Sequence, residues 1–437
     1  MTDLFAPLQS LKEGHWFKLI CGASFQHLAA VRSLTLAYTL AGADCIDVAA
    51  DPAVIAAAQE ALQVAKHLAR DAQERGFGCK GNLPFLMVSL NDGEDPHFRK
   101  AEFNSTECPP DCSKPCERIC PAQAIVFSRI KDDFSGVESQ KCYGCGRCIP
   151  VCPYDIIYTK SYMSPPRAIA PLVMSTGVDA VEIHTKVGRL AEFQRLWQVI
   201  SQWAEHLKVV AISCPDGEGM IDYLHAIYDL ISPRPTALIW QTDGRPMSGD
   251  IGDGTTLAAV KLGQKVLAAK LPGYVQLAGG TNNYTIAKLK AMGLLKRVGK
   301  EDTEIRGYGD AGNTSSNSLA ASPYPSGTLR ANGFGSLDST GSGATPVLGS
   351  PQVEEVASKT PTSSPRLPAS ASSIAGVAYG SYARVLLSPI LDRLENKEVS
   401  NTSVKATVRL EENEVLLWQA VELAYSLVSQ LKSQQER

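Results

Sequence analysis

The chain has 437 residues, of which 44% are apolar, so it is long enough for one large domain or for two to three ordinary ones. Its formal net charge is only −3, from 42 basic and 45 acidic side chains, and this balance argues against a nucleic-acid partner. The first residues lack the pattern of a secretion signal, and no apolar stretch is as long as a membrane span. We therefore expect a soluble, cytoplasmic protein.

Strand-like and helix-like patterns alternate in the first part of the chain. Apolar runs predict strands at 16–21, 45–49 and 85–90, and helical patterns between them cover 27–41 and 52–74. The predicted order is βαβαβ.

Eight of the twelve cysteines then follow in two runs. Because no secretion signal is present, this clustering indicates metal binding rather than a disulfide framework. The second run is the stronger signal, since it has the C-x₂-C-x₂-C-x₃-C-P spacing of bacterial ferredoxins. Its four cysteines are Cys142, Cys145, Cys148 and Cys152.

The first run follows the same plan, with one extra residue in each of its first two gaps. Its cysteines are Cys108, Cys112, Cys116 and Cys120. In ferredoxins of this type the fourth cysteine of each run binds the other cluster, so Cys152 would complete the first site and Cys120 the second. The sequence thus predicts two [4Fe–4S] clusters, or a [3Fe–4S] cluster in the first site if Cys108 cannot reach its iron.

Two Cys₄ zinc sites and plain structural cysteines are the alternatives. Zinc ribbons separate two C-x₂-C pairs by a long loop, and the runs found here do not have that form. Core packing is the expected role of the four cysteines outside the runs, because free cysteine is among the most buried residue types. They are Cys21, Cys45, Cys79 and Cys214.

The alternation resumes after the cysteines. Further strands and helices are predicted, in chain order, at 178–184, 190–205, 208–213, 220–231, 237–241, 255–270, 274–278 and 284–294. Residues 303–373 are rich in Ser, Gly, Pro, Thr and Asn and lack any period, which predicts a disordered insertion. An eighth unit follows it, with a strand at 374–379 and a helix opening at Gly380, and an amphipathic helix covers 411–432.

Repeated βα units with short turns predict a parallel sheet, and eight units can close into a (β/α)₈ barrel. The ferredoxin-type module would be inserted after strand three, and an open doubly wound sheet is the competing fold. The predicted divisions are the first part of the barrel (1–98), the two-cluster module (99–165), the second part of the barrel (166–302), the insertion (303–373) and the last βα unit with the C-terminal helix (374–437).

Glycines follow strands seven and eight, where barrels often bind a phosphate with backbone amides at a helix start. The positions are Gly279, Gly280, Gly380 and Ser381. Flavin mononucleotide, or another phosphate ligand, would suit such a cradle, but tight turns would explain the same glycines equally well.

Several polar residues also lie near the ends of predicted strands, where a barrel enzyme draws its acids and bases. They are Glu182, His184, Asp216, Asp243 and Arg245. No nucleophile–base pair or metal spacing stands out among them, so no catalytic residue is assigned.

Three segments together resemble one family. Cys108 to Pro121, Gln276 to Asn282 and Gly376 to Arg384 are similar to the cyanobacterial light-dependent period proteins, over nearly the whole chain outside the insertion. The resemblance implies an iron–sulfur protein that adjusts the circadian period to light by sensing the redox state that photosynthesis sets. It also implies contacts with clock input and oscillator proteins, and only the eight cysteines carry over as site residues.

We therefore expect a redox sensor that exchanges electrons with a photosynthetic donor, and not an enzyme. The rival hypothesis is a flavin-dependent barrel oxidoreductase that receives electrons from the clusters. A simple electron carrier would not need so large a barrel.

Overall fold

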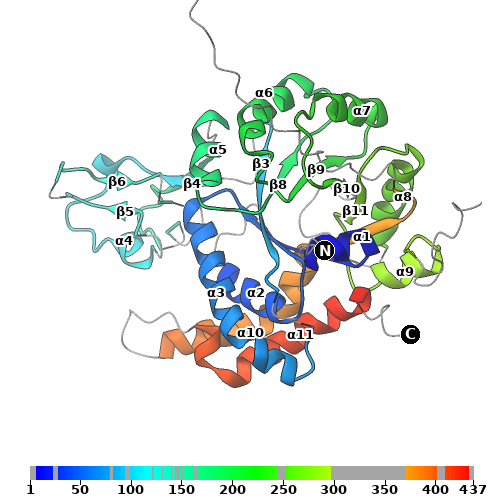
Figure 1. Cartoon of the computed structure of the whole chain (residues 1–437). Helices are drawn as coiled ribbons and strands as arrows, with labels where there is room; N and C mark the ends of the chain where they lie inside the picture. Colours follow the sequence, from blue (N-terminus) through cyan, green and yellow to red (C-terminus); the bar gives the residue numbers. More distant parts are fainter. Residues whose placement is uncertain are drawn as a thin grey trace, which may run out of the picture. The chain divides into compact units, whose positions relative to one another are not determined.

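A closed barrel of eight parallel strands forms the centre of the computed structural model (Figure 1). The strands are β1 (Trp16–Gly22), β2 (Cys45–Ala49), β3 (Phe85–Asn91), β8 (Ala180–His184), β9 (Val209–Pro215), β10 (Leu238–Asp243), β11 (Tyr274–Ala278) and β12 (Ile374–Tyr379). Around the barrel they run in the order β1-β12-β11-β10-β9-β8-β3-β2. The predicted (β/α)₈ barrel is confirmed, and the open sheet is excluded.

The structure describes residues 6–22, 28–78, 82–93, 99–120, 123–129, 131–139, 141–142, 148–149, 151–161, 166–244, 252, 254–296, 371–400 and 409–432. Nearly all of the predicted insertion, residues 303–370, therefore lies outside the described residues. The predicted boundaries between the parts of the chain stay predictions.

Helices follow the strands, as βα repetition requires. They are α2 (Leu28–Leu40), α3 (Pro52–Glu74), α6 (Leu190–Ile200), α7 (Met220–Leu230), α8 (Thr255–Ala268), α9 (Thr285–Ala291), α10 (Ser381–Ser400) and α11 (Glu414–Lys432), with α5 (Pro166–Met174) ahead of β8. Helix α3 shows why these elements start where they do. Asp51 accepts a hydrogen bond from the amide of Ala53 at 2.8 Å, and Pro52 occupies the first helical position, where it has no amide to satisfy.

Successive strand residues alternate between the two faces of the barrel wall. Outward side chains such as Phe17, Val88 and Ile212 pack under the helices in the main core, and inward ones such as Phe85, Val209 and Ile239 form a second cluster inside the barrel. Each strand is therefore buried on both faces, which explains its nearly continuous apolar sequence.

Helix α1 (Ala6–Glu13), which the sequence patterns do not predict, closes the amino end of the barrel (Figure 1). Its Leu8 and Leu11 pack on the inward side chains Trp16, Cys45 and Phe85. Apolar side chains thus fill the amino-terminal half of the barrel interior among the described residues.

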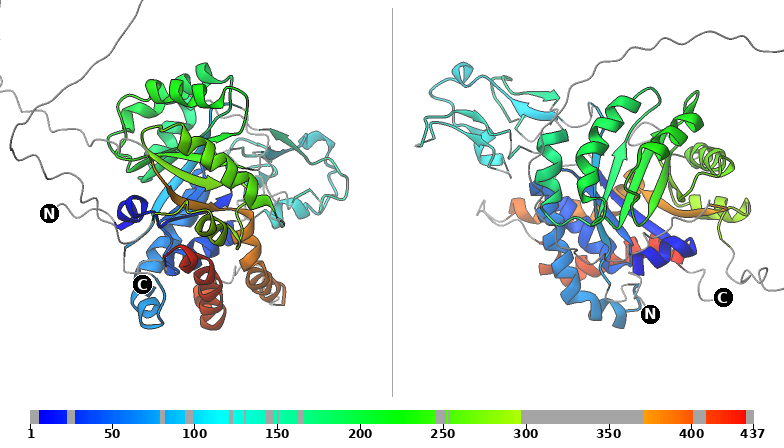
Figure 2. Two further views of the ribbon diagram at one scale, coloured as in Figure 1. Left: turned by 90° about the vertical axis from the view of Figure 1, so that its right-hand side faces the viewer. Right: turned by 45° about the horizontal axis from the view of Figure 1, so that its top comes forward.

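The last helices pack against the first ones, so that the ends of the chain close the helical ring. Helices α10 and α11 lie side by side, and α11 also contacts α2 (Figure 2). Tyr38 donates a hydrogen bond to the carbonyl oxygen of Ala383 at 2.9 Å, and Arg32 forms an ion pair with Glu411. These contacts hold the last βα unit, β12 with α10, against the first helices and so help it to complete the barrel.

The segment between β3 and β8 forms a small module of its own. Its elements are β4 (Arg99–Glu102), a 3₁₀ turn (Ser105–Glu107), α4 (Pro115–Ile119), β5 (Ile125–Val126), β6 (Gly136–Val137) and β7 (Tyr158–Ser161). β4 pairs with β7 and β5 with β6, both antiparallel. The module therefore sits in the chain after the third barrel strand, as predicted.

Candidate functional site

The first cysteine run is positioned by short turns. Cys108 follows the 3₁₀ turn that Asn104 caps through the amide of Thr106, at 3.2 Å. Cys116 lies on α4, whose start has Pro115 at the first position and Lys114 in the left-handed conformation. The proline and the left-handed residue force the chain to turn sharply between consecutive cysteines.

Cys108 and Cys116 of the first run lie within electrostatic reach of Cys152. The pKa of Cys116 is raised to about 11, chiefly by burial and also by negative charge on Cys152 and Cys108. The pKa of Cys108 is also raised, by burial and then by Cys112 and Cys152. These four cysteines are the set that the cross-over pattern assigns to one cluster, although the ligation itself stays a prediction.

The two halves of the module repeat one local geometry. The third residue after the last cysteine of each run is left-handed: Gln123 has φ 49° and Asp155 has φ 52°. Their amides donate to the carbonyl oxygens of Cys120 at 3.1 Å and of Cys152 at 3.4 Å, respectively. The same turn thus follows both Cys-Pro pairs, as expected for two copies of one cluster-binding unit.

The sulfur atoms face a small apolar core and backbone donors. Cys116, Cys142, Cys148 and Cys152 are buried together with Ala101, Phe103, Ala124, Ile125 and Ile157. The amide of Ala124 donates to Sγ of Cys120 at 3.2 Å, and that of Lys114 donates to Sγ of Cys112 at 3.4 Å. Amide donors of this kind favour the thiolate that an iron–sulfur cluster requires. Cys145 lies outside the described residues.

The cysteine thiols of the two runs suit an iron–sulfur cluster better than they suit a single metal ion. All ten described cysteines are free thiols, so no disulfide competes for them. Within the described parts of the chain, no three His, Cys, Asp or Glu side chains group closely enough to hold one metal ion. A cluster spreads its thiolates over several irons, and the donors can therefore stand further apart.

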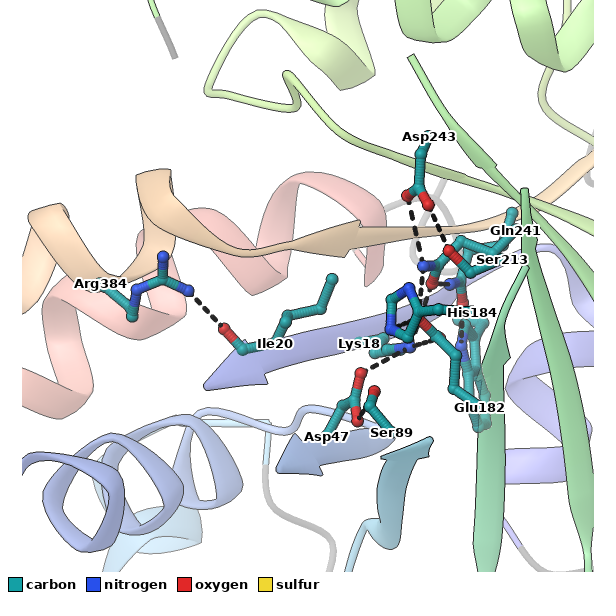
Figure 3. Close-up of polar contacts among 12 residues, drawn as sticks. Lys18, Ile20, Asp47, Ser89, Glu182, His184, Ser213, Gln241, Asp243 and Arg384 are labelled. Atoms are coloured by element: carbon teal, nitrogen blue, oxygen red, sulfur yellow. Dashed lines mark hydrogen bonds and ion pairs between the residues drawn. The ribbon is translucent and has the colours of Figure 1, made fainter. Parts of the chain in front are cut away.

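A second polar assembly lies inside the barrel, on the inward faces of several strands (Figure 3). Lys18 of β1 is fully buried and forms ion pairs with Asp47 of β2, at 2.9 Å, and with Glu182 of β8. Burial would lower the pKa of Lys18, but these two carboxylates outweigh burial and raise it. Lys18 is therefore held as a cation, and its amine is not a free nucleophile.

Two glutamines extend this assembly across the barrel. Gln241 of β10 accepts a hydrogen bond from Lys18 at 3.0 Å and donates one to Glu182 at 2.7 Å. Gln276 of β11 donates to Gln241 at 2.6 Å and accepts from the indole of Trp16 at 2.6 Å. Every strand-borne polar group in this layer thus has a partner from another strand.

Three further side chains extend the assembly toward the carboxyl ends of the strands. Nε2 of His184 lies 3.1 Å from Glu182, and the His184 side chain is 33% exposed. Asp243 accepts hydrogen bonds from the hydroxyl of Ser213 and, at 3.4 Å, from Gln241. The sequence placed Glu182, His184 and Asp243 near strand ends, and the structure brings these three together.

The other polar residues considered from the sequence are not part of the assembly. Asp216 is exposed and pairs with Lys265 at 2.6 Å, and Arg245 lies outside the described residues. Sequence reasoning missed Lys18 and Asp47. Their signal was a charged residue at an inward position of an otherwise apolar strand.

The predicted phosphate-binding glycines adopt the expected turn but are engaged by the protein itself. Gly279 and Gly280 have φ 61° and 90°, and the carbonyl of Gly280 accepts from Thr255 at 2.8 Å. Ser381 begins α10 and accepts from Arg384 at 3.0 Å. Turn formation accounts for the first two glycines, and a phosphate ligand stays a prediction.

The three cysteines of the barrel that the structure describes are buried, as core packing requires. Burial raises the pKa of Cys21 and Cys214 to about 12 each and that of Cys45 well above its usual value. Such thiols are poor nucleophiles. Cys79 lies outside the described residues.

No helix among the described residues is long and apolar enough to cross a membrane.

Comparison with known proteins connects both parts of the chain to one family. Residues 172–430 match the profile of the light dependent period A C-terminal domain, and residues 108–163 match that of the LdpA iron–sulfur cluster-binding domain. The protein named light dependent period A from Synechococcus elongatus is 50% identical over 289 residues, which cover 66% of this chain and 77% of that protein. An uncharacterized ferredoxin of Methanocaldococcus jannaschii is 38% identical over 47 residues, which cover 11% of this chain and 29% of the ferredoxin.

Proposed function

This chain belongs to the light dependent period A family, and we propose that it is a redox sensor that adjusts the circadian period to light. The iron–sulfur binding domain is part of the family assignment, whereas sensing is our proposal. We further propose that the module holds two clusters, each with three cysteines of one run and the last cysteine of the other. A bound cluster supplies one-electron chemistry at potentials that the surrounding protein sets.

One observation carries the proposal. Charge on Cys152 raises the pKa of both Cys108 and Cys116, although Cys152 belongs to the other run. Such mixing of the runs is what two interleaved cluster sites require. The module can then respond as a unit, because a change at one site alters residues that hold the other.

A sensor must also present two states that a partner distinguishes. We propose that the partners are clock input and oscillator proteins and that the electrons come from the photosynthetic pool. A partner that bound both states equally would transmit nothing, since only differential affinity shifts an equilibrium. The partner-binding surface must therefore include residues whose contacts depend on the state of the module.

Partner recovery from lysate tests the proposal. The full chain, prepared anaerobically, is offered to lysate as oxidised, reduced and cluster-free protein. We expect at least one partner whose recovery differs several-fold between the oxidised and reduced forms. Equal recovery in all three states, with substrate-dependent electron consumption by the isolated protein, would support the flavin-dependent barrel oxidoreductase instead. An absorption spectrum of the same preparation supplies the control, because flavin bands would be visible beneath those of iron and sulfur.

A further inference from the structure

Lys114 has an unusual conformation in the turn between the second and third cysteines of the first run. Its φ is 51°, in the left-handed region that residues other than Gly, Asn and Asp rarely adopt. It precedes α4 directly, and its side chain makes no capping hydrogen bond to that helix. Glycine would adopt the same conformation without strain. A lysine held there therefore points to a role for its side chain.

Lys114 faces the first site, by which we mean the thiols of Cys108, Cys112, Cys116 and Cys152. Its amide donates to Sγ of Cys112 at 3.4 Å. The pKa of Cys108 is raised, chiefly by burial, and the positive charge of Lys114 acts in the opposite direction. The residue therefore presents both an amide donor and a positive charge to the first site.

An aromatic ring of the module holds the ammonium group of Lys114. Nζ lies 4.6 Å from the centroid of the Phe127 ring, within the range of a cation–π contact. The Phe127 ring packs in turn against that of Phe103, with centroids 5.6 Å apart, and Phe103 is buried in the apolar core of the module. The charge is thereby kept near the thiols, where it is screened less than a charge that moves freely in water.

A fixed positive charge beside an iron–sulfur cluster favours the reduced form. Reduction adds one electron, and the potential depends on net charge and on hydrogen bonds to the sulfurs. The exposed Asp111 acts in the opposite sense. Its charge and the thiols of the first site both raise the pKa of Tyr154, after desolvation, which places Asp111 beside the same site. Lys114 and Asp111 should therefore shift the potential in opposite directions.

We propose that Lys114, held by Phe127, sets the reduction potential of the first cluster, and that its charge makes this site accept an electron more readily. Lys114 acts through its charge and through the amide bond to Cys112, and not as a ligand of iron. The inference rests on the two-cluster module proposed above. It does not depend on the use of that module as a clock sensor.

An anaerobic redox titration of the full chain with dithionite, followed by electron paramagnetic resonance, measures the effect. The signal lost in Cys116→Ser identifies the first cluster. At the potential where this cluster is half reduced in the parent, Lys114→Gln should lower its ratio of reduced to oxidised form by about threefold or more, because the charge is lost. Lys114→Arg keeps the charge and should restore the parent ratio. Lys160→Gln is the control, since Lys160 is an exposed lysine of the module that pairs with Glu102 at 3.3 Å, and it should change nothing.

Two further variants separate charge from packing. Phe127→Leu keeps an apolar side chain but removes the ring that holds the ammonium, so it should lower the same ratio. In the Lys114→Gln background it should add little, because no ammonium remains to be held. Asp111→Asn removes the opposing charge and should raise the ratio. It gives a reading of opposite sign even if Lys114→Gln does not retain the first cluster.

The outcomes separate this inference from the module on which it rests. An unchanged ratio in Lys114→Gln, with the iron content and both signals intact, would overturn the role of Lys114 and leave the module in place. A Phe127→Leu effect that persists in full without Lys114 would do the same, as would a lower or unchanged ratio in Asp111→Asn. A parent chain that binds no cluster would overturn the module, and the inference with it.

Discussion

Lys18 and Glu182 form an ion pair inside the barrel although 164 positions separate them in the chain. Neither side chain is exposed to solvent. Because Lys18 also pairs with Asp47 at 2.9 Å, strands β1, β2 and β8 are connected through one ammonium group. The pair therefore makes the polar layer depend on closure of the whole barrel.

Replacing Lys18 with Met should destabilise the protein strongly. The change leaves Asp47 and Glu182 buried without a cation, and removing one partner of a buried pair typically costs about 3–5 kcal/mol. The free energy of unfolding from urea titration, followed by tryptophan fluorescence, measures the loss. Arg70→Met is the control, since Arg70 is exposed and pairs with Glu74 on the same helix, where the cost is about 0.5 kcal/mol or less. Similar values for both variants would contradict the assigned role of Lys18.

Replacing Gly376 of β12 with Ala should disturb the contact of Trp16 with the polar assembly inside the barrel. A Cβ there would stand 2.4 Å from the carbonyl oxygen of Trp16 and 2.7 Å from its side chain. We expect Gly376→Ala to cost about 1–3 kcal/mol and to shift the fluorescence of Trp16, whose indole donates to Gln276. Gly252→Ala is the matched control, because nothing lies within 4 Å of its added methyl. Equal stability of the two variants would show that strand β12 can move aside.

The ion pair between Arg32 and Glu411 should make stability depend on pH. Burial alone would raise the pKa of Glu411, but hydrogen bonds from Arg32 outweigh it and hold the pKa below its usual value. The unfolded chain, with a glutamate pKa of about 4.3, therefore binds the proton first. Stability from this group is fully present above that pH and is lost as the pH falls through the lower folded pKa.

Glu411→Gln isolates that contribution. We expect the variant to be about 1 kcal/mol less stable at neutral pH, where it lacks the charge that Arg32 contacts at 2.7 Å. The gap between the two proteins should close as the pH falls below about 4.3, because the parent then loses the same charge. Urea unfolding over a pH series measures both values. A gap that stays constant into the acid range would mean that Arg32 does not hold the carboxylate.

The barrel was predictable because strands that are buried on both faces are recognisable in the sequence as largely apolar runs. β2 and β11 are buried on both faces and are apolar except for Asp47 and Gln276, and the predicted bounds 45–49 and 274–278 match the structure. Helix α1 was missed because eight residues with a weak apolar pattern do not stand out without the barrel end on which Leu8 and Leu11 pack. Tertiary contacts, and not local propensity, specify that helix.

The cysteine module and the polar assembly inside the barrel also differ in how far the sequence predicts them. The cysteine runs could be recognised because the chemistry demands a fixed local spacing. The polar layer could not, because Lys18, Glu182 and Gln241 lie on strands that are distant in sequence, and only closure and register bring them together. His184 and Asp243 were noted as polar residues near strand ends, but nothing local in the sequence shows that Glu182 lies between His184 and Lys18.

The crossed arrangement of the cysteines gives the last prediction. If the fourth cysteine of each run serves the other site, Cys120→Ser should perturb the cluster held by the second run, although Cys120 belongs to the first. Cys116→Ser and Cys148→Ser supply reference electron paramagnetic resonance spectra for loss at the first and second site. The spectrum and iron content of Cys120→Ser should then match those of Cys148→Ser, and Cys152→Ser should match Cys116→Ser, because charge on Cys152 acts on Cys116. The reverse pairing would mean that each run binds its own cluster and that the electrostatic contact of Cys152 with the first run has no part in ligation.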